Sequence, residues 1–213
     1  MSSTAKSNIL KKIKQALDTP VPVPFPAHYA PDLPNVFREN SEDLAVLFAE
    51  QFTKLQGQFV FCMNMHECVA QLQVLMQKKG WTKWYCTDGA IMEAMHKAGW
   101  QNDWHPSLAD CHVSITACES LVARTGTMVL SSAASSGRTT SVYAPIHICI
   151  AHSGQLVYDP ADALSQLQMK YGLQLPSQIS FASGPSRTAD IEKTLVTGVH
   201  GPKEVFCFLI ESA

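Results

Sequence analysis

The sequence predicts an α/β protein with a mostly parallel sheet, preceded by an N-terminal helix and a proline-rich strap. Two observations carry this prediction. Short apolar runs alternate with segments of helical periodicity from residue 41 to residue 100. Further apolar runs then follow, separated by segments rich in Gly, Ser and Thr. The 213 residues suit one large domain with an appendage, and we divide them into residues 1–40 and 41–213.

The appendage begins with a predicted amphipathic helix over residues 4–18, with Ile9, Leu10, Ile13 and Leu17 on one face and lysines on the other. Residues 19–34 follow, with a proline at every second position from Pro20 to Pro26. Proline at this density excludes a helix and a central strand, so we expect an extended strap. The strap leaves open whether the helix lies on the body of the protein or on a partner.

The first half of the body contains strands and helices in alternation. Glycines end all three helices, at Gly57, Gly80 and Gly99, and Thr87-Asp88 is a typical helix cap. The expected elements are a helix from 41–43 to Gly57, a strand at 59–62, a helix at 66–79, a strand at 84–86 and a helix up to Lys97.

The second half of the body favours strands joined by tight turns. Residues 120–123 and 127–130 flank Arg124-Thr125-Gly126, which is typical of a strand, a turn and a returning strand. The segment "DPADALSQLQM" predicts a helix with a proline in its first turn. The remaining expected strands are Val142-Tyr143 with 147–151, then 179–182 and 205–210.

Two polar stretches lie where an α/β sheet commonly binds ligands, in loops beyond the strand ends. In the first, Ser183-Gly184-Pro185-Ser186 leads to Thr188, Asp190 and Glu192, which indicates a loop entering a short helix. Its free N–H groups and hydroxyls suit a phosphate or carboxylate, or they serve only as helix caps. His200, in Val199-His200-Gly201-Pro202, either faces a ligand or is an ordinary turn residue.

The second stretch surrounds a single arginine with small residues. Gly137 and Arg138 stand among serines and threonines in "SSAASSGRTTSVY". A guanidinium can bind two oxygens of one anion, whereas the alternative is a solvated loop. We predict that Arg138 and His200 face one pocket near Ser183–Ser186.

Composition excludes several other classes of protein. A formal charge of −2 disfavours binding to nucleic acid or anionic membranes through bulk electrostatics. The apolar runs are too short for a membrane span, and the first residues do not form a secretory signal, so we expect a cytoplasmic protein.

Motifs for common active sites and metal centres do not occur. The seven cysteines include no C-x-x-C pair, and the histidines have no H-x-H or H-E-x-x-H spacing, so we expect neither a metal site nor a cofactor held by this chain alone. The sequence also contains no P-loop, G-x-G-x-x-G or G-x-S-x-G motif.

Four segments together carry a resemblance to a known family: "TACESLVARTGTMVLSS", "SGR", "PIHICIAHSGQLV" and "SGPSRTADIEKTLVTGVHGPKEVFCFLIE". In this order they resemble the LUD domain of the lactate-utilisation protein C type. The resemblance is close over residues 85–211 and looser before them. It implies a fold similar to the NagB/RpiA/CoA-transferase group, a three-layer α/β/α body.

The resemblance also implies which residues form the site. Many relatives have an acid where this chain has Arg124, which puts an acid–base role at that position in doubt. The candidate ligand-binding residues are Glu119, Thr125, Gly126, Thr127, Gly137, Arg138, His147, Ser183, Gly184, Ser186, Thr188, Asp190, His200 and Gly201.

The function implied by the resemblance is that of an accessory subunit in the oxidation of L-lactate to pyruvate. Iron–sulfur clusters are then expected on partner proteins, and this chain is expected to bind a small anionic ligand. An alternative, by analogy of fold alone, is an independent transferase, isomerase or ligase acting on a CoA ester, a sugar phosphate or a folate. The sequence assigns no reaction step to this chain, and a regulatory module is the weakest alternative because no helix-turn-helix pattern is evident.

Overall fold

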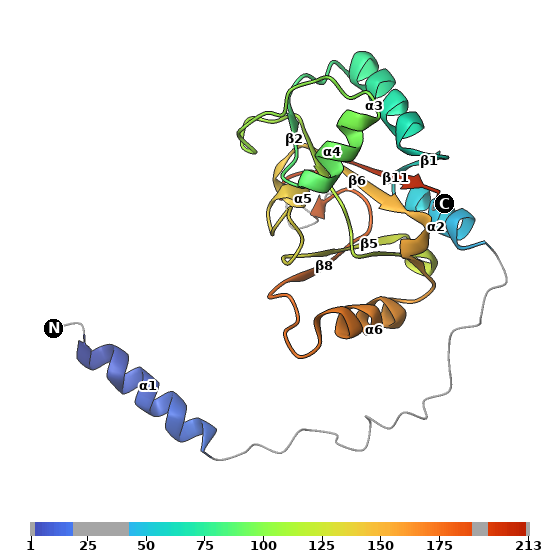
Figure 1. Ribbon diagram of the computed structural model, residues 1–213. Helices are drawn as coiled ribbons and strands as arrows, with labels where there is room; N and C mark the ends of the chain where they lie inside the picture. The colour runs from blue at the N-terminus through green and yellow to red at the C-terminus, as the bar shows by residue number, and fades with distance from the viewer. Residues whose placement is uncertain (1–2, 19–42, 189–195, 212–213) are drawn as a thin grey trace. The chain divides into compact units, whose positions relative to one another are not determined.

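The computed structural model describes residues 3–18, 43–188 and 196–211 (Figure 1). The chain divides into two units, Met1–Ser41 and Glu42–Ala213. The first contains α1 (Ser3–Leu17), which confirms the predicted N-terminal helix. The predicted strap at residues 19–34 lies outside the described residues.

The centre of the second unit is a sheet of five parallel strands in the order β1-β11-β6-β3-β2. This confirms the predicted α/β class with a mostly parallel sheet. The strand β3 was not predicted, although all four of its residues are buried between β2 and β6. The bounds are β1 (Gln58–Cys62), β2 (Trp84–Tyr85), β3 (Val113–Thr116), β6 (Ile146–His152) and β11 (Glu204–Ile210).

Helices cover both faces of this sheet. α3 (Met65–Lys79) and α4 (Gly89–Lys97) pack on one face, against Ile115, Ile148 and Phe206 among others. α2 (Leu44–Lys54) packs on the other, where Phe48 and Phe52 contact the second core cluster (Figure 1). The caps follow the sequence, since the side chains of Asp43, Asn64 and Asp88 accept hydrogen bonds from the first turns.

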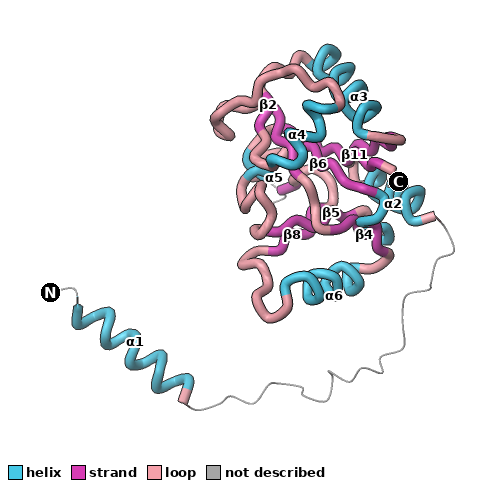
Figure 2. Tube along the Cα trace, viewed as in Figure 1, coloured by secondary structure: helices cyan, strands magenta, loops and turns pink. Residues whose placement is uncertain are grey.

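A second sheet, of four strands, lies beside the first (Figure 2). Its order is β7-β4-β5-β8, and it shares a core cluster with the central sheet through Leu121, Met128 and Leu130. α6 covers its other face, where Leu167 packs against Val122 and Val129. The bounds are β4 (Ser120–Val122), β5 (Thr127–Ser131), β7 (Leu156–Val157), β8 (Ile179–Ala182) and α6 (Pro160–Tyr171).

Two short segments differ from their predictions. Val142 and Tyr143 form the end of the short helix α5 (Thr140–Tyr143) instead of a strand, because their N–H groups both donate to the Thr139 carbonyl. After Ser186 the chain enters strand β9 (Arg187–Thr188), which pairs with β10 (Val196–Thr197), and not a helix. Residues 189–195, which include Asp190 and Glu192, lie outside the described residues.

Candidate functional site

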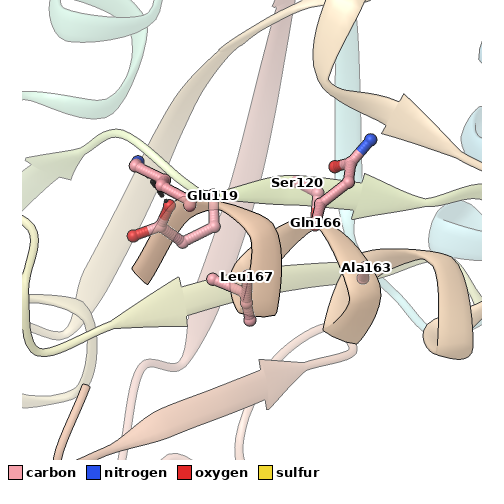
Figure 3. A pocket seen from close by; sticks show the side chains of 6 residues that line it. Glu119, Ser120, Ala163, Gln166 and Leu167 are labelled. Atoms are coloured by element: carbon pink, nitrogen blue, oxygen red, sulfur yellow. Dashed lines mark hydrogen bonds and ion pairs between the residues drawn. The ribbon is translucent and has the colours of Figure 1, made fainter. Parts of the chain in front are cut away.

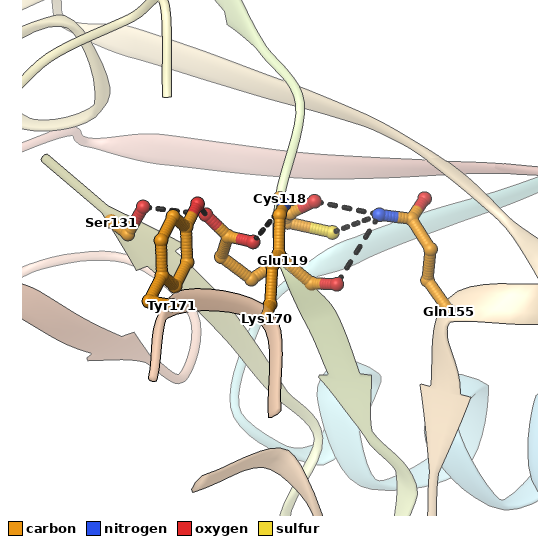
Figure 4. Close-up of polar contacts among 6 residues, drawn as sticks. All are labelled: Cys118, Glu119, Ser131, Gln155, Lys170 and Tyr171. Carbon is orange, nitrogen blue, oxygen red and sulfur yellow. Dashed lines mark hydrogen bonds and ion pairs between the residues drawn. The ribbon is translucent and has the colours of Figure 1, made fainter. Parts of the chain in front are cut away.

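Glu119 is a buried carboxylate that accepts hydrogen bonds from three side chains, between the second sheet and α6 (Figure 4). Ser131 Oγ donates to Oε1 at 2.5 Å, and Tyr171 Oη donates to the same oxygen at 2.8 Å. Lys170 Nζ forms an ion pair with Oε2 at 2.8 Å. Only 7% of the Glu119 side chain is exposed, whereas Lys170 is 61% exposed. The network therefore joins the sheet to the outer helix through a desolvated anion.

The backbone around Glu119 is fixed from two directions. The Glu119 N–H donates to the Val129 carbonyl at 2.7 Å, next to the pairing of β4 with β5. Gln155 Nε2 donates to the Cys118 carbonyl at 2.6 Å and to the Glu119 carbonyl at 3.5 Å (Figure 4). The carboxylate is thus held in place by its own backbone as well as by α6.

The surroundings keep Glu119 ionised. Burial alone raises the pKa of this carboxyl, but hydrogen bonds from Lys170, Ser131 and Tyr171 outweigh it and the pKa is lowered. A carboxylate with a lowered pKa is a weak general base at neutral pH. Glu119 is therefore suited to orienting other groups, and not to taking up a proton.

A small pocket opens beside Glu119, between β4 and α6 (Figure 3). It has a volume of about 80 Å³, and it is lined by Glu119, Ser120, Ala163, Gln166, Leu167 and Lys170. This is the space of two or three water molecules, at ~30 Å³ each in the liquid. The pocket therefore accommodates one end of a polar molecule, with Lys170 and Gln166 on the exposed side.

Ser120 supplies an unused polar group to this pocket. Its side chain lies on the α6 face of β4, because it alternates with Leu121, which faces the central sheet. The residue is 1% exposed, and Oγ has no hydrogen-bond partner among the described residues. A buried hydroxyl without a partner costs ~1–3 kcal/mol, so a water or a ligand atom that bonds to it is favoured.

Three of the predicted site residues form a chain of hydroxyls at the turn before β5. Thr127 Oγ1 lies 2.8 Å from Thr125 Oγ1 and 2.6 Å from Ser183 Oγ. The glycines beside them, Gly126 and Gly184, pack against the end of α2. A Cβ at Gly126 would lie 2.4 Å from the Phe52 nitrogen, and one at Gly184 would lie 2.4 Å from the Leu55 carbonyl oxygen. Because neither glycine carries a Cβ, the backbone at Gly126 and at Gly184 can approach the end of α2 closely.

Backbone hydrogen bonds join Ser186 to the loop at residues 198–202. The Ser186 N–H donates to the Pro202 carbonyl, and the Gly198 N–H donates to the Ser186 carbonyl. Gly201 lies directly against Ser186, since a Cβ there would be 2.8 Å from Ser186 Cβ. His200 is exposed, and Thr188 is half-buried in β9.

Arg138 contacts a different part of the structure from His200. Its guanidinium donates to Ser177 Oγ, close to the start of β8, and the side chain is exposed. Gly137 before it adopts a left-handed conformation with φ 63° and has open space around it. Both Arg138 and the loop of His200 lie near α5, because Gly201 approaches the Val142 carbonyl. A pocket shared by Arg138 and His200 stays a prediction.

His147 is fully enclosed in the central sheet. It is 1% exposed, and Nε2 lies 2.8 Å from Thr116 Oγ1 on the neighbouring strand. Burial lowers its pKa to about 4, so the ring is neutral at physiological pH. As placed here, His147 has the environment of a buried core histidine whose ring nitrogen is hydrogen-bonded.

The sequence named Glu119 as a candidate but not the residues that surround it. Ser120 stands in the same motif segment without being singled out, and Gln166, Lys170 and Tyr171 lie outside the motif segments, the last two beyond the end of the predicted helix at Met169. Arg124, the departure from the pattern in relatives, forms a 2.8 Å ion pair with Asp159, which caps α6. The positive charge at position 124 is therefore matched by an acid from a neighbouring segment.

The described residues contain no group of three His, Cys, Asp or Glu side chains that could hold a metal ion. All seven cysteines are buried free thiols. Burial raises the pKa of the Cys86 thiol to about 11. Within the described part of the chain, no helix is long and apolar enough to cross a membrane.

Comparison with known proteins gives a consistent result. Residues 35–210 match the LUD domain family. Lactate utilization protein C of Halalkalibacterium halodurans is 39% identical over 100 residues, which cover 46% of this chain and 43% of that protein. The namesake from Shouchella clausii is 38% identical over 99 residues, with the same two coverages. The chain is therefore aligned with less than half of each of these relatives.

A solved structure supports the fold alone. The crystal structure of a DUF162 family protein from Deinococcus radiodurans superposes with a TM-score of 0.55 at 15% identity. The superposition covers 78% of this chain and 96% of that one.

Proposed function

Because the chain belongs to the LUD domain family, we propose that it acts in lactate utilisation, as an accessory subunit in the oxidation of L-lactate to pyruvate. The observation that carries the proposal is the match to proteins named Lactate utilization protein C, at 34–40% identity over about 100 residues. In this proposal iron–sulfur proteins carry the electrons, and this chain holds no cluster of its own.

The proposal includes a small carboxylic acid as ligand, bound at the pocket beside Glu119. Lys170 offers N–H donors beyond the one that meets Glu119, and Gln166 carries an amide at the same opening. Ser120 lines the pocket, and its buried Oγ has no hydrogen-bond partner among the described residues. A carboxylate at Lys170 with its hydroxyl or carbonyl directed to Ser120 matches these groups.

The cellular role is tested by deleting the gene and measuring growth on L-lactate as carbon source. We expect growth on L-lactate to be lost, growth on pyruvate to be retained, and the wild-type gene to restore the former. Pull-down of the tagged chain should recover proteins rich in iron and sulfide. Normal growth of the deletion strain on L-lactate would contradict the proposal.

The ligand is tested separately, by thermal unfolding of the purified chain with L-lactate, pyruvate and acetate. A ligand that binds only the folded state raises Tm with concentration. We expect Lys170→Gln to remove this shift, whereas Lys83→Gln, a change of another exposed lysine, leaves it intact. Loss of the shift in Arg138→Ala and His200→Ala, but not in Lys170→Gln, would place the ligand at the originally predicted loops instead.

A further inference from the structure

The N-terminal helix α1 has an apolar face that no other described residue of its own unit covers. Ile9, Leu10, Ile13 and Leu17 are each at least half exposed, at 59%, 56%, 50% and 75%. An isolated helix of 15 residues is only marginally stable in water. A surface that buries these four side chains would therefore stabilise the helix as well as bind it.

All charged side chains of α1 are positive. The helix contains four of the sixteen Lys and Arg residues of the chain and none of its eighteen Asp and Glu residues. The net charge of the whole chain is −2, which by itself disfavours anionic partners. The positive charge of α1 is therefore not visible in the net charge. The helix is thus suited to an anionic surface even though the complete chain is slightly acidic.

The lysines also lie in a particular place relative to the apolar face. With ~100° per residue, the four large apolar side chains span a sector of about 100° on the helix. Lys12 and Lys14 fall just outside its two borders, about 60° from Ile9 and about 40° from Leu10, and Lys11 lies on the far side. The fourth lysine, Lys6, falls within the sector, near the N-terminal end of the helix. Border lysines can lay their methylene stems along an apolar layer while their ammonium groups reach a polar one. This is the arrangement of helices that lie in the plane of a membrane interface.

We propose that α1 binds the surface of an anionic lipid bilayer, with its axis parallel to the membrane and its apolar sector at the boundary of the acyl chains. Lysines on both borders fit a flat layer of negative charge. The helix rises ~22 Å over its 15 residues, which is shorter than the ~30 Å hydrocarbon core, so it lies on the bilayer and does not span it.

The test is flotation of the full chain with phosphatidylcholine vesicles, with and without phosphatidylglycerol. We expect binding only to the vesicles that contain phosphatidylglycerol, and release at about 1 M salt, where the Debye length falls to ~3 Å. Lys12→Gln and Lys14→Gln should each weaken binding about fivefold, the effect of one basic residue near an anionic surface. Lys83→Gln, on an exposed lysine of the other unit, should have no effect.

The apolar contribution is tested with a matched pair of aspartates. Ile13→Asp should weaken vesicle binding at least tenfold, whereas Val74→Asp, at the similarly exposed Val74 of α3, should leave it unchanged. Circular dichroism should show that both variants keep the fold of the second unit. Equal binding to both kinds of vesicle, unchanged binding by Ile13→Asp, or binding of an acidic protein without any vesicle binding would each overturn the proposal.

Discussion

Two motif glycines, Gly126 and Gly137, share a left-handed backbone but differ in their surroundings. Their φ angles are 57° and 63°. A Cβ at Gly126 meets the backbone of Gln51 and Phe52, whereas a Cβ at Gly137 meets nothing within 4 Å. At Gly126 a side chain therefore adds a clash with a helix backbone to the cost of the left-handed conformation.

We predict that Gly126→Ala lowers the free energy of unfolding by about 3 kcal/mol and Gly137→Ala by about 1 kcal/mol. Urea unfolding of the two variants beside the wild type measures both values. Equal losses would mean that the contact between the turn and α2 is not what requires glycine at position 126.

The buried His147 makes stability depend on pH. Its folded pKa of about 4 lies below the ordinary value of 6.5, so between these values the unfolded chain binds more protons than the folded one. Stability is therefore expected to fall as the pH drops from about 6.5 to about 4, by up to ~3 kcal/mol from this residue. Urea unfolding at a series of pH values follows this loss.

A substitution separates His147 from the other titrating groups. His147→Gln should flatten the stability profile between pH 4 and 6.5, although the variant is less stable throughout. His66→Gln, on an exposed histidine, should retain the wild-type slope. If both variants keep the same slope, His147 is not the group responsible.

At the scale of elements, α6 is joined to the second sheet by the hydrogen bonds that Glu119 accepts from Lys170 and Tyr171 of α6. Ser131 of β5 donates to the same carboxylate. We predict that Glu119→Gln lowers the free energy of unfolding by about 2 kcal/mol at pH 7, because charge-assisted bonds from Lys170 and Ser131 are weakened. Tyr171→Phe removes one donor and should cost about 1 kcal/mol. Urea unfolding at pH 7 gives both values.

The pH dependence of this network has a definite sign. The folded pKa of Glu119 is lowered, so its contribution is present above the unfolded pKa and is lost as the pH falls through the folded pKa. The difference in stability between wild type and Glu119→Gln should therefore shrink in acid. A difference that stays constant down to pH 2 would contradict this account of the network.

The sequence predicts most elements of the fold because local chemistry defines them. Asp43 and Asp88 cap helices as expected, and Gly80 ends α3 in a left-handed conformation. The strand β3 escaped prediction because Val-Ser-Ile-Thr is short and half polar, and it is fixed by pairing with β2 and β6. Val142-Tyr143 has high strand propensity, but hydrogen bonds to Thr139 give it a helical turn.

The candidate site was less predictable because the residues that contact one another there are far apart in the sequence. Lys170 and Tyr171 lie 51 and 52 residues from Glu119, and only the packing of α6 on the second sheet brings them together. The hydroxyl chain of Thr127 and Ser183 joins residues 56 apart. The motif segments thus contain Thr127, Ser183 and Ser131, whereas Lys170 and Tyr171 come from α6, which carries no motif.

At the scale of the whole molecule, the division into two units has a measurable consequence. The second unit, Glu42–Ala213, contains all three hydrophobic core clusters of the described residues. We predict that a chain beginning at Glu42 unfolds cooperatively with a free energy within about 1 kcal/mol of the full chain, since residues of this unit form all three clusters. Urea unfolding monitored by tryptophan fluorescence suits this test, because Trp81, Trp84, Trp100 and Trp104 all lie in or against the first cluster.

A loss well above 1 kcal/mol would show that residues 1–41 stabilise the body. An unchanged midpoint together with lost binding to anionic vesicles would separate the role of α1 from that of the domain behind it.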